Sequence, residues 1–160
     1  MNKSIVIKCD TRNISLVEDF VQAVCDDSHV ANYSAVVSVP VVRVVDSLMQ
    51  MGASDEVRLQ FNYTRKGLTF TISCDCPCFF SEKSMAVQDG KIFSDELFYL
   101  VEMLSDDLSV CDGGYGLSIS FGVRGIDAGE VMRRMRVLKD FDAKNMSSKK
   151  KGADVVKVDL

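Results

Sequence analysis

The amino-acid sequence predicts an α+β fold, a two-layer sandwich whose mixed or antiparallel sheet carries helices on one face. Short segments with alternating apolar residues adjoin one another and are joined by glycine-containing turns, which is typical of β-hairpins. Segments with apolar residues three and four positions apart form separate runs, as in amphipathic helices. The resulting order is strand, two helices, two strands, loop, helix and two strands, and this order indicates two layers.

The length and composition fit one folded domain. We expect residues 1–142 of the 160 to form it and residues 143–160 to be a charged, mobile tail. A hydrophobic content of 47% and a charged content of 26% exclude disorder as the main state. The net charge of −4 argues against general nucleic-acid binding. No apolar run of ~18 residues and no signal segment is evident, so the sequence predicts no membrane span and a cytoplasmic location.

The first elements are a strand and two helices. Apolar and polar residues alternate in Ser4–Lys8, as they do in a short strand. The residues that follow have apolar positions three and four apart, as in a helix. Ser15 and Glu18 match a capping box at the start of this first helix. Pro40–Met51 has one apolar face, a proline suited to a first turn and Gly52 at the C-cap position. We therefore predict a second helix that begins at the proline.

A hairpin follows the second helix. Apolar residues alternate in Val57–Arg65 and again in Leu68–Cys74, and Lys66 and Gly67 form the turn between them. Pro77 is expected to end the second strand, because proline cannot donate to a sheet ladder.

The remaining core elements are a loop, a helix and a second strand pair. Phe79–Ile92 shows no clean period and is expected to be a loop long enough for a lid. A helix is predicted from Ser94 to Leu104, then a short strand at Leu108–Cys111 and a last strand at Leu117–Val123. The apolar positions of the helix are Leu97, Tyr99 or Leu100, Val101 and Leu104. The glycines at 113–116 are expected to form the hairpin turn.

An extra helix is predicted at Asp127–Phe141, outside the core elements. Asp127 and Glu130 match a cap pattern at its start. Its apolar side is expected to hold Val131, Met132, Met135 and Leu138. Its basic side is expected to hold Arg133, Arg134, Arg136 and Lys139. We interpret the basic side as a solvated face, with partner docking as the alternative.

Six cysteines and one histidine limit the chemistry. Cys74, Cys76 and Cys78 share one face of a strand, but a zinc site takes four ligands with a second pair elsewhere. We predict no metal and interpret the cysteines as small buried thiols in a reducing compartment. His29 lies at the expected end of a helix, where it favours the helix dipole, so nucleophilic catalysis through histidine is not expected.

Three stretches carry a resemblance to a known family. They are SIVIKCDTRNISLVEDFVQAVC, VVRVVDSLMQMGASDEVRLQFNYTRKGLTFTISCD and DELFYLVEMLSDDLSVCDGGYGLSISFGV. In order and hydrophobic rhythm, the chain resembles the histidine-kinase-type (GHKL or Bergerat) ATPase fold, and more narrowly its anti-sigma-factor serine-kinase branch. The resemblance covers residues 4–123, which implies that the helix at 127–141 is an addition to the family-like core.

The nucleotide motifs of the family are mostly absent. The resemblance places its catalytic glutamate at Arg43 and its magnesium-holding asparagine at Ser47. Asp75 matches the aspartate that accepts the adenine amino group, whereas Cys76 and Cys78 stand where glycines allow close approach of the nucleotide. In the family a Gly-x-Gly lid opening precedes the last helix, and here that place holds Ser94, Asp95, Glu96 and Leu97.

The resemblance implies a non-catalytic or weakly nucleotide-binding regulatory protein that acts by protein–protein contact. Asp75 and Ser47 would be the vestiges of a nucleotide pocket lined by Arg43, Cys76 and Cys78. No catalytic residue is assigned, and ATP or ADP with magnesium would bind weakly at most. The implied partner is a sigma factor or an STAS-type anti-sigma antagonist, and a homodimer stays open. The alternatives are an ATP-dependent serine kinase or ATPase with an altered pocket and an unrelated small α+β binding domain.

Overall fold

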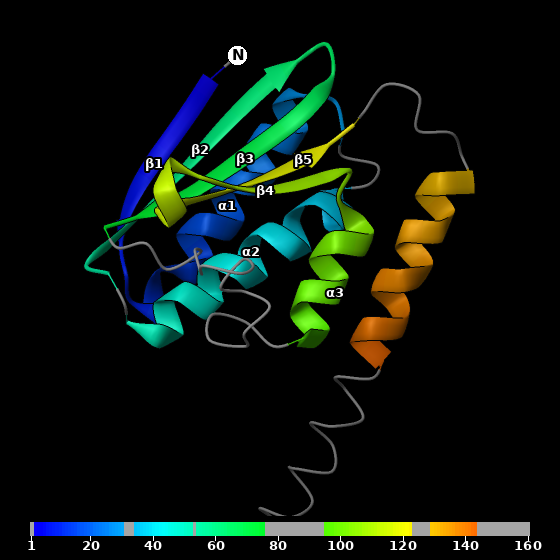
Figure 1. Ribbon diagram of the computed structural model, residues 1–160. Coiled ribbons are helices and arrows are strands. Elements are labelled where there is room, and N and C mark those ends of the chain that lie inside the picture. The colour runs from blue at the N-terminus through cyan, green and yellow to red at the C-terminus, as the bar shows by residue number, and fades with distance from the viewer. Residues whose placement is uncertain (1, 31–33, 53, 76–94, 123–128, 144–160) are drawn as a thin grey trace, which may run out of the picture.

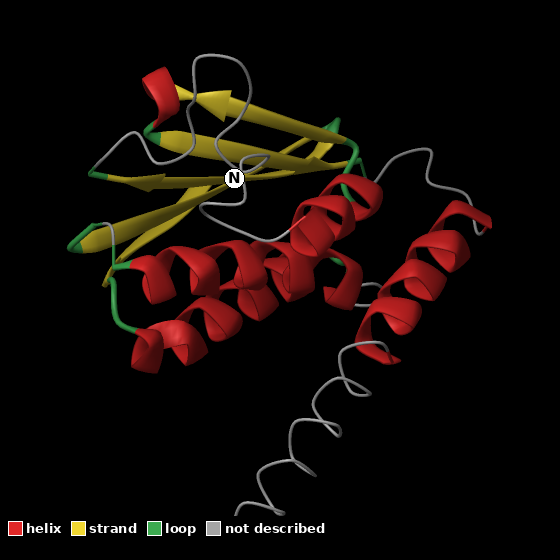
Figure 2. Ribbon diagram, turned by 60° about the horizontal axis from the view of Figure 1, so that its bottom comes forward, coloured by secondary structure: helices red, strands yellow, loops and turns green. Residues whose placement is uncertain are grey.

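The computed structural model describes residues 2–30, 34–52, 54–75, 95–122 and 129–143. Over these residues the chain is an α+β sandwich, as predicted, with an antiparallel sheet in the order β1-β2-β3-β5-β4. The strands are β1 (Asn2–Lys8), β2 (Glu56–Thr64), β3 (Gly67–Cys74), β4 (Asp107–Cys111) and β5 (Gly116–Phe121). The helices are α1 (Ile14–Asp27), α2 (Ser34–Met51), α3 (Asp95–Leu104) and a C-terminal helix described over 129–143. The long helices cover one face of the sheet (Figures 1 and 2).

The predicted hairpin of β2 and β3 is confirmed. Thr64 pairs with Gly67, so Arg65 and Lys66 form a two-residue loop and the strand ends one residue earlier than expected. Gly67 has a φ of +136°, and a Cβ at this position would lie 2.1 Å from the Phe121 carbonyl oxygen. Glycine is therefore required at this turn by both the backbone conformation and the neighbouring strand.

Alternation along the strands builds the core between the sheet and the helices. In β2 and β3 the apolar residues of one phase are buried, and their polar neighbours lie on the other face. Phe70 lies between two other buried rings, with centroids 5.3 Å from Phe61 and 6.2 Å from Phe121. These aromatic side chains fill the middle of the sheet's inner face.

Helix α2 begins at Ser34, so the predicted start at Pro40 is wrong. Pro40 lies inside the helix, where it lacks the N–H that would bond to the carbonyl of Val36. Val36 and Val37 are buried in the core, and this packing outweighs the strand propensity of β-branched residues. Tertiary contacts thus extend the helix on the N-terminal side of Pro40, back to Ser34.

By length and composition alone, α2 could cross a membrane, with a mean hydropathy of 1.3 over Ser34–Met51. The sequence-based expectation that no apolar segment reaches this length is therefore wrong. Val41, Val44 and Val45 are fully buried among the other elements of the sandwich. In this fold α2 is the central helix of the core.

Helix α1 begins at Ile14, and the predicted capping box is wrong because Ser15 lies inside the helix. A 3₁₀ turn at Thr11–Asn13 precedes α1, and the Asp10 carboxylate accepts the Arg12 backbone N–H at the start of this turn, at 2.9 Å. The Asp10 side chain thus caps the 3₁₀ turn, while Asn13, at the N-cap position of α1 itself, makes no side-chain capping hydrogen bond.

Helix α3 packs against the core through one apolar face, and a strand pair follows it. In α3 the buried residues are Leu97, Leu100, Val101 and Leu104. Tyr99 is exposed, so Leu100 is the correct one of the two predicted core positions. The strand pair β4 and β5 follows as predicted, joined through a 3₁₀ turn at Asp112–Gly114.

The predicted inner face of the C-terminal helix is partly wrong. Met132 and Met135, expected on the core side, are 62% and 46% exposed. Arg134, expected in solvent, is only 5% exposed, while Leu138 is buried as predicted. The reason is electrostatic, because Asp106 and Glu130 provide carboxylate partners for the buried guanidinium. The C-terminal helix includes residue 143, where the predicted tail was to begin. The predicted loop at 79–92, the Pro77 strand end and residues 144–160 of the predicted tail lie outside the described residues.

Candidate functional site

Arg43 and Ser47 both lie half-buried on α2, one helical turn apart. The Arg43 guanidinium carbon lies 5.9 Å from the centroid of the Phe141 ring on the C-terminal helix. Arg43 also lines a depression of about 380 Å³ between α1, α2 and the end of the C-terminal helix. Three carboxylate side chains line the same depression, those of Glu18, Asp19 and Asp142. Its acidic lining disfavours a phosphate group there.

Asp75 is exposed at the end of β3. Its backbone N–H donates a hydrogen bond to Ser54 Oγ at 3.0 Å, and this hydroxyl donates to the Glu56 carbonyl at 2.8 Å. Among the described residues, no hydrogen bond or ion pair joins Asp75 to Arg43 or Ser47. Cys76 and Cys78, expected to line the same pocket, lie outside the described residues.

A second depression, of about 690 Å³, lies where β1 ends and β2 begins, next to Ser54. Lys8 and Arg12 supply its positive charges, and Asp10 and Asp55 its negative charges. Arg12 bonds the Asp10 carboxylate through Nη2 and Nε, at 2.6 and 3.0 Å. These hydrogen bonds lower the pKa of Asp10 to about 2, so the pair stays ionised and mutually neutralised. The balanced charge gives this depression little preference for an anion.

The face of the sheet opposite the helices carries two rows of polar residues across all five strands, and we call it the open face. The strand registers align Asn2, Asn62, Thr69, Ser120 and Asp107 in one row. They align Ser4, Gln60, Thr71, Ser118 and Ser109 in the next row. Asp107, on the edge strand β4, is the one charged residue in these two rows.

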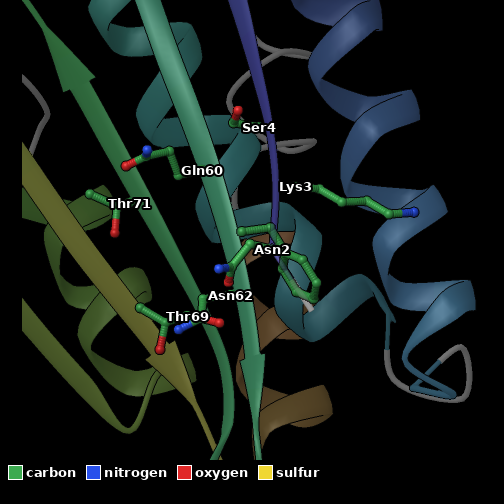
Figure 3. A pocket seen from close by; sticks show the side chains of 8 residues that line it. Asn2, Lys3, Ser4, Gln60, Asn62, Thr69 and Thr71 are labelled. Carbon is green, nitrogen blue, oxygen red and sulfur yellow. The ribbon is translucent and has the colours of Figure 1, made fainter.

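The side chains of the open face border a third depression, of about 390 Å³, over β1, β2 and β3. Gln60, Asn62, Thr69 and Thr71 reach toward it from neighbouring strands, as Figure 3 shows. Lys3 also borders it, but its side chain turns toward α1 and its ammonium contacts the Asp27 carboxylate at 2.5 Å. The lining therefore offers amide and hydroxyl groups without a free charge.

Hydroxyl groups of the open face also pair across strands. Thr69 Oγ1 and Ser120 Oγ lie 3.1 Å apart, as do Thr71 Oγ1 and Ser118 Oγ. Such groups exchange hydrogen bonds readily, but at neutral pH they have no protonation change to use in acid–base catalysis. The arrangement fits recognition of a polar surface rather than chemistry.

Sequence reasoning did not assign the open face as a site. The polar phase of each strand was visible in the sequence, as in the alternation around Gln60 and Thr71. The rows form only when five strands are placed in register. β1 pairs with β2, and β5 pairs with β3, through contacts between distant parts of the chain. The sequence therefore shows which residues of each strand are polar, but it does not show that they line up in rows across the sheet.

The described residues also limit what else the site can hold. Within 2–30, 34–52, 54–75, 95–122 and 129–143, no group of three His, Cys, Asp or Glu side chains could hold a metal ion. Cys25 is fully buried, and burial, with a smaller contribution from Asp26, raises its pKa to about 11. Neither a protein-family model nor a curated protein sequence matches this chain.

Proposed function

We propose that this protein is a non-catalytic regulatory module of the cytoplasm that acts by protein–protein contact, as a degenerate relative of anti-sigma serine kinases. Its partner is a sigma factor or an STAS-type antagonist, the two classes that the resemblance implies. A reducing location is consistent with the unpaired thiols of Cys25 and Cys111.

The position of Arg43 is the observation that carries this proposal. The resemblance puts the catalytic base of the family at this residue, and a guanidinium stays protonated and cannot accept a proton. The same guanidinium lies over the Phe141 ring, at a distance typical of a cation–π contact. The side chain at the expected base position therefore packs the last helix against α2.

The surroundings of Arg43 support weak nucleotide binding at most. Glu18, Asp19 and Asp142 line its depression and would repel a triphosphate. Asp75, the one residue that matches the nucleotide motifs, lies at the end of β3 without a described contact to Arg43. Among the described residues, no contact brings Arg43 and Asp75 together around a single nucleotide.

The open face supports a role in docking. The cores of protein interfaces are depleted in charged residues, and the two polar rows carry one carboxylate, at their β4 end. Their amide and hydroxyl groups can donate and accept hydrogen bonds with a partner's polar surface. In a chain of net charge −4, this is a surface that an acidic partner can approach with little repulsion.

Nucleotide binding can be tested by isothermal titration calorimetry of the full chain with magnesium and ATP or ADP. We expect no measurable heat of binding in the micromolar range. Asp75→Ala is the informative variant, because it removes the one matching motif residue from an exposed position. A micromolar affinity that Asp75→Ala abolishes would contradict the proposal and favour the kinase or ATPase alternative.

Partner binding can be tested by affinity capture from extracts of cells that make the protein. We expect a sigma factor or an STAS-type protein to be recovered with the unmodified chain. Thr71→Arg puts a charge in the middle of the open face and should abolish recovery. The control Gln22→Arg puts the same charge on the exposed side of α1 and should leave recovery unchanged. Recovery of neither class by the unmodified chain would favour an unrelated α+β binding domain.

A further inference from the structure

Strand β4 forms one edge of the sheet and, among the described residues, pairs only with β5 (Figure 1). The Cys74 N–H donates to the Tyr115 carbonyl at 3.0 Å, in continuation of the β3–β5 register. Because bonded pairs alternate in an antiparallel ladder, odd-numbered residues of β5 bond to β3 and even-numbered residues bond to β4. The β4 partners of these even-numbered residues are odd-numbered, such as Ser109. Leu108 and Val110 therefore direct their backbone N–H and C=O groups outward from the sheet edge.

The apolar side chains of this edge face the core but are not fully covered. Leu108 and Val110 pack against the buried cluster on the inner face of the sheet, and both are half-buried. Asp107 and Ser109 lie on the open face and are exposed. An edge strand with outward backbone groups and apolar side chains is a template for pairing with another strand. A matching strand would be apolar on its inner face, and a cation on its outer face would complement Asp107.

The C-terminal sequence VVKVDL, residues 155–160, has this pattern. One phase of its alternation is wholly apolar and consists of Val156, Val158 and Leu160. The other phase holds a cation, Lys157, between Val155 and Asp159. Alternation of this kind is typical of a strand that covers a core with one face.

We propose that residues 155–160 pair with β4 of the same chain as a sixth strand, parallel to β4. The register of the pairing is Lys157 with Asp107, Val158 with Leu108, Asp159 with Ser109 and Leu160 with Val110. The apolar phase of the segment then extends the inner face of the sheet, and the lysine meets the one carboxylate of the polar rows. No like charges are paired, which would be destabilising. The sixth strand is independent of the proposed regulatory function.

The chain beyond the C-terminal helix is long enough for this pairing. Arg134 of that helix contacts Asp106, directly before β4. Residue 143, the last described residue, lies about 14 Å farther along the helix, at 1.5 Å per residue. Residues 144–156 can span more than about 40 Å when extended. Because the helix is held at the Asp107 end of β4, the shortest path brings the segment in at this end and parallel to β4.

Hydrogen exchange of the full chain, followed residue by residue by NMR, tests the sixth strand. The Leu108 and Val110 N–H groups point outward, so without a partner strand they exchange quickly with solvent. We expect their exchange to be at least about ten times slower in the full chain than in a chain that ends at Ala153. This shortened chain keeps every described residue. The Ser109 N–H bonds to β5 and should exchange equally slowly in both chains.

Two substitutions in the full chain test the apolar contact without shortening the tail. Val158→Asn removes the apolar side chain beside Leu108 and should speed exchange at Leu108 as much as the truncation does. The control Val155→Asn makes the same change in the outward phase and should leave this exchange unchanged. Equal effects of the two substitutions would contradict the predicted facing of the strand.

A charge exchange tests the register. Lys157→Glu places a carboxylate beside Asp107 and should remove the protection of Leu108. The same variant combined with Asp107→Lys restores opposite charges and should restore the protection. Equal exchange of Leu108 and Val110 in the full and shortened chains overturns the proposal. So does protection that rises with protein concentration, because a second copy would then supply the strand.

Discussion

Arg134 of the C-terminal helix donates hydrogen bonds to both carboxylate oxygens of Asp106, at 2.6 and 3.3 Å. Its Nε also donates to Glu130 Oε1 at 3.0 Å. Asp106 precedes β4 and accepts the Gly122 N–H, so it also holds the chain just after β5. Burial lowers the pKa of Arg134, but its bonds to Asp106 and Glu130 outweigh this and raise the value overall. One buried guanidinium thus ties the C-terminal helix to Asp106, and through Asp106 to the point where β4 begins and β5 ends.

Replacing Arg134 should destabilise the fold. Arg134→Met keeps an apolar stem but removes every hydrogen bond to Asp106, and we expect a loss of about 2 kcal/mol, as for hydrogen bonds to charged groups. Urea unfolding followed by circular dichroism measures the change. Arg133→Met is the matched control, because Arg133 pairs with Glu130 at the surface and should cost less than about 1 kcal/mol. Equal losses in the two variants would contradict the buried role of Arg134.

Stability should fall in acid as Glu130 becomes protonated. Hydrogen bonds from Arg133, and then from Arg134, lower the pKa of Glu130 from 4.5 to about 2. A lowered pKa stabilises the folded state above pH 4.5, and this contribution is lost as the pH falls from 4.5 to 2. In the Glu130→Gln variant, the free energy of unfolding should depend less on pH between pH 4.5 and 2. The pKa of Asp10 is also lowered to about 2, so Asp10→Asn should show a separate and additive effect.

The β2–β3 turn should not tolerate a side chain at Gly67. Gly67→Ala combines a positive φ with a Cβ 2.1 Å from the Phe121 oxygen, and we expect a cost of at least about 3 kcal/mol. Gly52→Ala is the control, since Gly52 has a φ of +62° but no atom within 4 Å of its Cβ position. There the left-handed conformation alone should cost about 1 kcal/mol. Chemical denaturation of both variants measures the difference, and similar values would show that the Phe121 carbonyl moves aside.

Cys25 should be inert in the folded protein. Its thiol is fully buried and its pKa is raised to about 11, so it forms little thiolate near neutral pH. Cys25→Ala should leave unchanged the number of thiols that react quickly with Ellman's reagent before unfolding, and lower by one the number that react in denaturant. Cys111→Ala, at a half-buried site, should lower the count in the folded protein. Fast labelling of Cys25, found by peptide mapping, would contradict its burial.

The strands were predictable because their signals are local. Alternation and the Lys66-Gly67 turn specify the hairpin, and the structure agrees to within one residue. The start of α2 was not predictable in this way, since Val36 and Val37 favour a strand locally and Pro40 matches a helix start. The burial of Val36 and Val37 against distant parts of the chain makes this segment helical.

The C-terminal helix shows a second limit of sequence patterns. Hydrophobic periodicity assigns Met132 and Met135 to the core, yet the helix turns Arg134 inward. No pattern within 127–141 reveals that Asp106, 28 residues earlier, provides the carboxylate. The candidate site has the same limit, because the polar rows of the open face exist only once five strands are in register.

The contacts of the C-terminal helix also decide how far the gene can be shortened. The resemblance covers residues 4–123, and a deletion variant designed on that range would end before Arg134. Asp106 would then lose its buried cation, and Arg43 would lose the Phe141 ring. The apolar side chains that face Val137 and Leu138 would be left open to solvent. The shortest open reading frame that encodes this fold intact must therefore continue beyond the codon for Phe141.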